Sequence, residues 1–70
     1  MTYTVHYTAP SGSKAEEHAI GVRAAERAMT FSSLGAADVY VETGDGQVFR
    51  APGEIDALVR YAQNSDDAGA

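Results

Sequence analysis

A stretch near the middle of the chain predicts a β-hairpin, and this hairpin limits the possible folds more than any other feature. Residues 37–43 and 47–51 are rich in β-branched and aromatic residues, and Gly44-Asp45-Gly46 separates them. Glycine and Asp-Gly sequences favour hairpin turns because they adopt positive φ angles readily. We expect a three-residue loop with Gly46 in the left-handed region, because a two-residue loop would reverse the second strand and expose Phe49.

The three-residue loop sorts the hairpin side chains into two faces, because successive residues of a strand point to opposite sides. The apolar face is expected to carry Val39, Val41 and Phe49. The other face is expected to display Tyr40, Glu42, Val48 and Arg50.

Residues 2–9 predict another strand. Tyr3, Val5, Tyr7 and Ala9 alternate with Thr2, Thr4, His6 and Thr8. A period of two in β-branched and aromatic residues is typical of a half-buried strand. The segment Pro10-Ser11-Gly12 is expected to end it, since proline cannot donate a ladder hydrogen bond.

Residues 13–33 predict one long helix. Ser13-Lys14-Ala15-Glu16 fits a capping box at its start, and Leu34-Gly35 is suited to closing it. Its apolar arc is wider than half of the helix and indicates burial on two sides, against the sheet and against a second helix or subunit. One stripe of this arc comprises Ile20, Ala24, Ala28 and Phe31, and the other comprises Ala15, Val22, Ala25 and Met29.

A shorter helix is expected between Pro52-Gly53 and Asn64. Its apolar residues, at helical spacing, are Ile55, Leu58, Val59 and Ala62. Residues 65–70 are expected to form a disordered tail.

These elements predict a single α+β domain over residues 1–64, with the order β-α-β-β-α. We expect a three-stranded, mainly antiparallel sheet packed by one long and one short helix. Strands 2–9 and 37–43 would flank a right-handed crossover through the long helix. Strand 47–51 would lie between them, rather than outside 37–43, which gives the strand order 1-3-2.

The residue types argue against an enzyme and against a bound cofactor. Cysteine is absent, and no serine lies in a G-x-S-x-G turn. His6 and His18 have no third ligand at a spacing that would build a metal site. We therefore expect no catalytic, cofactor-binding or metal-binding residues.

Charge and hydropathy indicate the expected partners and location. The formal net charge of −5 disfavours binding to nucleic acid, because phosphates would be repelled. No apolar run is long enough to cross a membrane, and the first residues lack a signal-peptide pattern. We expect a cytoplasmic protein with no membrane partner.

The outer face of the predicted sheet is the main candidate for a functional surface. It would display His6, Tyr40, Glu42 and Arg50, and exposed aromatic residues with arginine are enriched in protein interfaces. We therefore predict a small protein-binding module whose partner contacts this cluster or the acidic surface. The alternative is a structural or regulatory homodimer that binds a small ligand between subunits, with Val22 and Met29 on the dimer face. Association would support a cysteine-free chain of 70 residues, whose stability margin is thin.

One resemblance adds to this interpretation. The stretch from Lys14-Ala15-Glu16 through Ala28, followed by Asp38-Val39-Tyr40-Val41-Glu42 and Asp45-Gly46-Gln47-Val48, resembles small bacterial and phage β-α-β-β families of unknown function, including some anti-CRISPR proteins. The resemblance implies a phage-encoded inhibitor that acts by binding a bacterial defence complex. It assigns no functional residue, and the helix expected after residue 52 departs from the family pattern.

Overall fold

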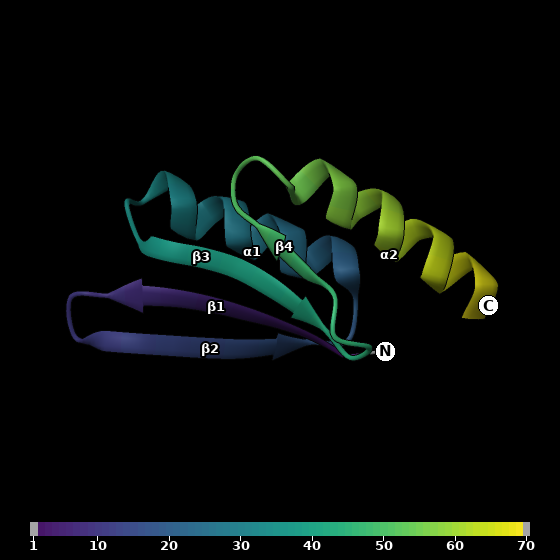
Figure 1. Cartoon of the computed structure of the whole chain (residues 1–70), viewed down its shortest axis with the longest axis horizontal. Helices are drawn as coiled ribbons and strands as arrows, with labels where there is room; N and C mark the ends of the chain where they lie inside the picture. The colour runs from purple at the N-terminus through teal and green to yellow at the C-terminus, as the bar shows by residue number, and fades with distance from the viewer. Residues whose placement is uncertain (1, 70) are drawn as a thin grey trace.

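Two helices pack on one face of a four-stranded antiparallel sheet (Figure 1). The computed structural model describes residues 2–69, and the side chains of residues 2–64. In chain order the elements are β1 (Tyr3–Ala9), β2 (Gly12–His18), α1 (Gly21–Ser33), β3 (Ala37–Thr43), β4 (Val48–Arg50) and α2 (Ile55–Gly69). The strands lie in the order β2-β1-β3-β4. Helix α1 lies over β1 and β3, and α2 packs beside α1 and against β4.

The fold is α+β as predicted, but the predicted three-stranded sheet with strand order 1-3-2 is wrong. The predicted pair of one long and one short helix is wrong too, because α1 has 13 residues and α2 has 15. Residues 12–18 form β2 and pair with β1 along its whole length, although residues 13–18 were expected to begin the long helix. Strand β2 returns the chain to the end of the sheet at which β1 starts. After α1, β3 therefore runs antiparallel to β1 and pairs with it directly. The strand after the turn, β4, lies outside β3 and not between β3 and β1.

The predicted capping box is also wrong, because Ser13 and Glu16 lie in β2 and α1 begins at Gly21. Lysine, alanine and glutamate favour a helix in isolation, but intrinsic propensity is weak enough for tertiary pairing to override it. Pairing with β1 satisfies the backbone groups on one side of this segment. Gly12, at φ +124, supplies the positive φ angle of the tight β1–β2 turn.

The predicted β3–β4 hairpin is confirmed, including its register. Val41 lies opposite Phe49, and Tyr40 lies opposite Arg50. The Thr43 amide donates a hydrogen bond of 2.9 Å to the Gln47 carbonyl, which closes the loop. Gly46 has the expected positive φ angle, 91°.

The core lies between the inner face of the sheet and the two helices. The helix end at Leu34-Gly35 is as predicted, since Leu34 is the C-cap and Gly35 has φ +88. Small alanines on α1 allow this helix to approach the sheet closely. The buried apolar residues are Tyr3, Val5, Ala24, Ala25, Ala28, Val39, Val41, Ile55, Leu58 and Ala62.

Gly21 allows a close approach between the two helices. A Cβ atom at this position would lie 2.2 Å from the Ala62 Cβ and 3.0 Å from Cζ of Tyr3. Such distances are far inside van der Waals contact, so any larger residue must move α2 or the buried Tyr3 ring. Gly21 is itself buried, and the space around it is already filled.

Of the tail predicted over residues 65–70, the structure describes only the backbone up to Gly69, which continues α2. The remainder of that prediction lies outside the described residues. Within residues 2–69, no helix is both long and apolar enough to cross a bilayer.

The Gly21 contact predicts that Gly21→Ala lowers the free energy of unfolding by about 1–3 kcal/mol, the usual cost of overpacking a filled site. Urea denaturation followed by circular dichroism would measure the change. Gly53→Ala is the matched control, because a Cβ there meets nothing within 4 Å. If Gly21→Ala proved as stable as Gly53→Ala, the tight helix crossing would be refuted.

Candidate functional site

The candidate site is a row of three side chains that crosses the outer face of the sheet. His6 on β1 lies opposite Tyr40 on β3, and Tyr40 lies opposite Arg50 on β4. Residues directly opposite in an antiparallel sheet share a face and have close Cβ atoms. Register alone thus places the three side chains, here called the outer-face row, in order across three adjacent strands.

Side-chain contacts bind the outer-face row together. The rings of His6 and Tyr40 are stacked, with centroids 4.5 Å apart and planes within 13° of each other. Arg50 adds a cation–π contact, with Cζ 5.8 Å from the Tyr40 ring centroid. His6 Nε2 lies 3.3 Å from Glu42 Oε1, within hydrogen-bonding distance. An aromatic pair contributes about 0.5–1.5 kcal/mol and an exposed cation–π contact about 0.5–1 kcal/mol, enough to restrict the side chains.

The structure therefore brings together all four residues that the sequence placed in the partner-binding cluster. His6 and Tyr40 are half-buried, whereas Glu42 and Arg50 are exposed. Beside them is an open hollow of about 340 Å³ with polar walls. Its lining residues are His6, Tyr7, Thr8, Ser13, Lys14, Asp38, Tyr40 and Arg50.

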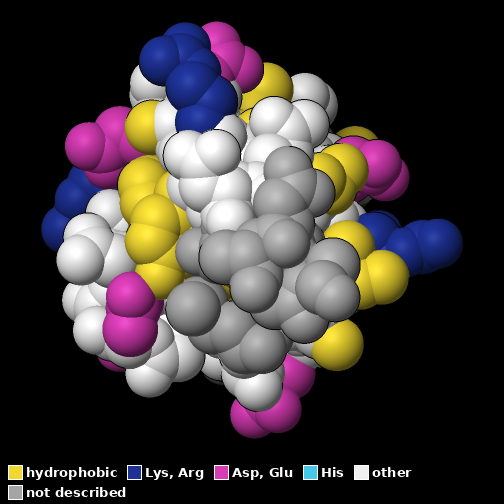
Figure 2. Space-filling view, turned by 90° about the vertical axis from the view of Figure 1, so that its right-hand side faces the viewer, with side chains coloured by type: hydrophobic (Ala, Val, Ile, Leu, Met, Phe, Trp, Pro, Cys, Tyr) yellow, Lys and Arg dark blue, Asp and Glu magenta, His cyan; other side chains and the backbone are white. Residues whose placement is uncertain are grey.

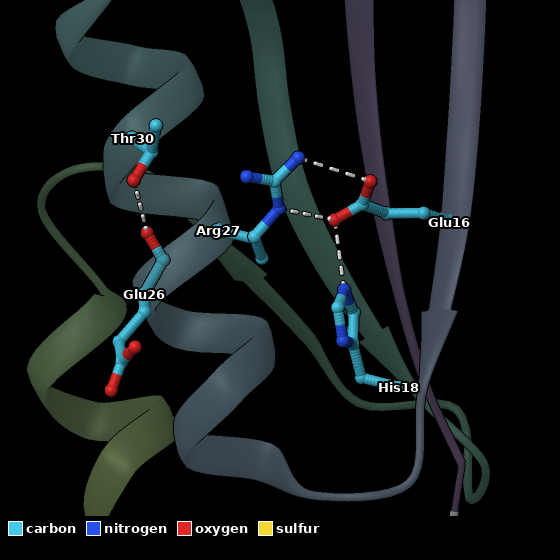
Figure 3. A network of polar contacts seen from close by, with 5 residues as sticks. All are labelled: Glu16, His18, Glu26, Arg27 and Thr30. Carbon is cyan, nitrogen blue, oxygen red and sulfur yellow. Dashed lines mark hydrogen bonds and ion pairs between the residues drawn. The ribbon is translucent and has the colours of Figure 1, made fainter.

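A second polar cluster joins β2 to α1 (Figure 3). Arg27 Nε donates a hydrogen bond of 2.8 Å to Glu16 Oε1, and His18 Nε2 lies 2.8 Å from the same oxygen. The hydrogen bond from Arg27 lowers the pKa of Glu16, and His18 adds to this effect against the opposing effect of burial. This cluster was not predicted from the sequence, because the helix expected over 13–33 would place Glu16 on the same element as Arg27.

A third cluster fixes the β3–β4 loop to α2. The hydroxyls of Thr43 and Tyr61 both donate hydrogen bonds to the Asp45 carboxylate. The Thr43 hydroxyl, and then the Tyr61 hydroxyl, lower the pKa of Asp45. These bonds hold the loop in place and so steady β4, which carries Arg50.

Val22 and Met29, predicted to form a dimer face, lie in a groove of about 450 Å³ between the two helices. Ala15, expected in the same stripe, is instead on β2. Helix α2 covers part of the stripe, since Ala25 and Ile55 are buried there, but Met29 stays 40% exposed. That a second subunit binds this groove stays a prediction.

No group of three or more histidine, cysteine, aspartate or glutamate side chains within the described part of the chain is placed to hold a metal ion. No protein-family model, curated protein or solved structure matches this chain. The geometry of the outer face is therefore the basis for proposing a function.

The Glu16 cluster predicts a pH-dependent contribution to stability. A carboxyl whose pKa is lower in the folded state stabilises the fold above its unfolded pKa, and this is lost as the pH falls through the folded value. Glu16→Gln should therefore lower the urea midpoint at pH 7, and the difference from wild type should shrink below about pH 4.5. Glu17→Gln, on the opposite face of β2, is the control. A Glu16→Gln deficit that persisted unchanged at pH 2.5 would contradict the ion pair.

Proposed function

We propose that this protein is a small, non-enzymatic protein-binding module that contacts its partner through the outer face of the sheet. The outer-face row is the observation that carries the proposal. It places two stacked rings and an arginine together on a face that neither helix covers.

The geometry of the outer-face row favours binding because the side chains are already ordered. Immobilising a flexible side chain at an interface costs about 0.5–1.5 kcal/mol. Stacking already restricts these side chains in the unbound protein, so less entropy is lost on binding. Tyrosine and arginine are also the residue types in which binding energy concentrates. An uncovered sheet face with a central aromatic pair suits a protein surface better than a small molecule, because a small molecule needs an enclosing pocket and the hollow beside the row is open.

Charge supports a protein partner over a nucleic acid. The outer face carries Glu42 beside the outer-face row, and Glu17 lies on the same face of β2, so a phosphate backbone would meet carboxylates. Among the described side chains visible around the end of the molecule where α2 finishes, acidic and basic residues are interspersed (Figure 2). The outer-face row, whose side chains contact one another, is a better candidate contact than a general acidic surface.

The anti-CRISPR-like role implied by the sequence resemblance would be one form of this proposal. An inhibitor that occludes a surface on a bacterial defence complex needs a contact face and no chemistry. In this form of the proposal, the outer-face row would make that contact.

The proposal predicts that Arg50→Ala and Tyr40→Ala each weaken partner binding by roughly tenfold or more, as at an interface hot spot. Affinity capture from a bacterial lysate, followed by titration of the retained partner, would measure the loss. Arg60→Ala removes the same charge from the exposed surface of α2 and should bind like wild type. Equal retention by Arg50→Ala, Tyr40→Ala and Arg60→Ala would overturn the assignment of this face.

A further inference from the structure

Strand β2 forms a long, open edge of the sheet. It pairs with β1 on one side, and no described element of the chain pairs with its other side. The opposite edge, β4, is only three residues long, whereas β2 has seven. An unpaired strand presents a row of amide and carbonyl groups that can pair with another chain.

The order of charges along β2 is self-complementary about its centre. Lys14 and Glu16 flank Ala15 and point to the helix side of the sheet, because they lie opposite the inward-facing Tyr7 and Val5. If two copies of β2 pair antiparallel with Ala15 opposite Ala15, each Lys14 lies opposite Glu16 of the other copy. On the outer face, each Ser13 then lies opposite Glu17 of the other copy.

Neighbouring registers lack this complementarity. A two-fold axis perpendicular to the sheet places the helix-side faces of both copies on the same side. Residues of one face must therefore pair with residues of the same face, which limits the registers that are possible. The next register in one direction sets Lys14 opposite itself, and the next in the other direction sets Glu16 opposite itself. Like charges directly opposite are destabilising, so only the register centred on Ala15 has both charge pairs favourable.

We infer that β2 pairs with β2 of a second copy of this chain, centred on Ala15, to give one continuous sheet across both copies. Lys14, the chain's single lysine, then forms an ion pair with Glu16 of the other copy at both ends of the contact.

The local structure is compatible with this pairing. Arg27 holds both carboxylate oxygens of Glu16, at 2.8 and 3.5 Å, and His18 shares the nearer one. A carboxylate accepts about four hydrogen bonds, so Lys14 of the second copy can also bind. Lys14 itself is exposed, and α1 lies mainly over β1 and β3. Ala15 at the two-fold axis is small, so the strands can approach to normal spacing.

Charge reversal tests this inference by sedimentation velocity and native mass spectrometry. Wild type is expected to dimerise, and Lys14→Glu, which opposes carboxylates at both ends, should raise the dissociation constant at least about tenfold. Arg60→Glu makes the same charge change on α2 and should dimerise like wild type.

A mixing experiment tests the register. Lys14→Glu and Glu16→Lys should each be monomeric alone, but a mixture should form a one-to-one heterodimer, because every charge pair becomes opposite again. The Glu16→Lys variant could unfold because it loses the contact with Arg27. In that case Ala15→Asp is the variant to test, with Ala15→Ser as its control. The aspartates would face each other at the axis, so Ala15→Asp should be monomeric and Ala15→Ser dimeric.

Three outcomes would overturn the inference. These are a wild-type monomer at millimolar concentration, a Lys14→Glu dimer as tight as wild type, or dissociation by Met29→Glu but not by Lys14→Glu. The last would identify the groove between the helices as the dimer contact. None of these outcomes tests the outer-face row, because partner binding by that row is measured in a separate experiment.

Discussion

The close contact between Gly21 and Ala62 above the ring of Tyr3 determines the arrangement of this molecule. Because Gly21 has no side chain, α2 can pack directly beside α1 on the same face of the sheet. The buried residues of both helices then share one core with β1 and β3. The opposite face of the sheet is left without a helix, and this is the face on which polar and aromatic side chains are displayed.

Strand β2 has a different role from the other strands, because it buries no apolar side chain. Its position depends on pairing with β1 and on the contact of Glu16 with Arg27, which connects the sheet edge to α1. Arg27 also lies over Phe31, whose ring stacks on Tyr7 of β1. The stack and the ion pair together hold the β1–β2 hairpin against α1 beyond the main core.

The sequence predicted the parts of the fold that depend on local pattern and missed the part that depends on pairing at a distance. Glycine and aspartate in the turn, with the need to bury Phe49, were enough to give the β3–β4 register. Residues 12–18 lack alternating apolar side chains, and their lysine, alanine and glutamates favour a helix locally. The Pro10-to-Gly12 turn was the remaining signal for a hairpin, since proline and glycine commonly occupy the second and fourth positions of a type I turn. A strand held by one neighbour's backbone leaves little other trace in its own sequence.

The candidate site also depends partly on local pattern and partly on pairing at a distance. Alternation along each strand places His6, Tyr40 and Arg50 on one face whichever way the strands are ordered. Their contacts depend on the order, because a strand 47–51 inserted between the other two would have separated His6 from Tyr40. In the observed order β1 and β3 are neighbours, so the two rings stack and Arg50 reaches Tyr40 from the other side. Strand β2, which was not predicted from the sequence, is thus what brings these side chains into one surface. It adds a reversal of the chain, and this reversal makes β3 antiparallel to β1.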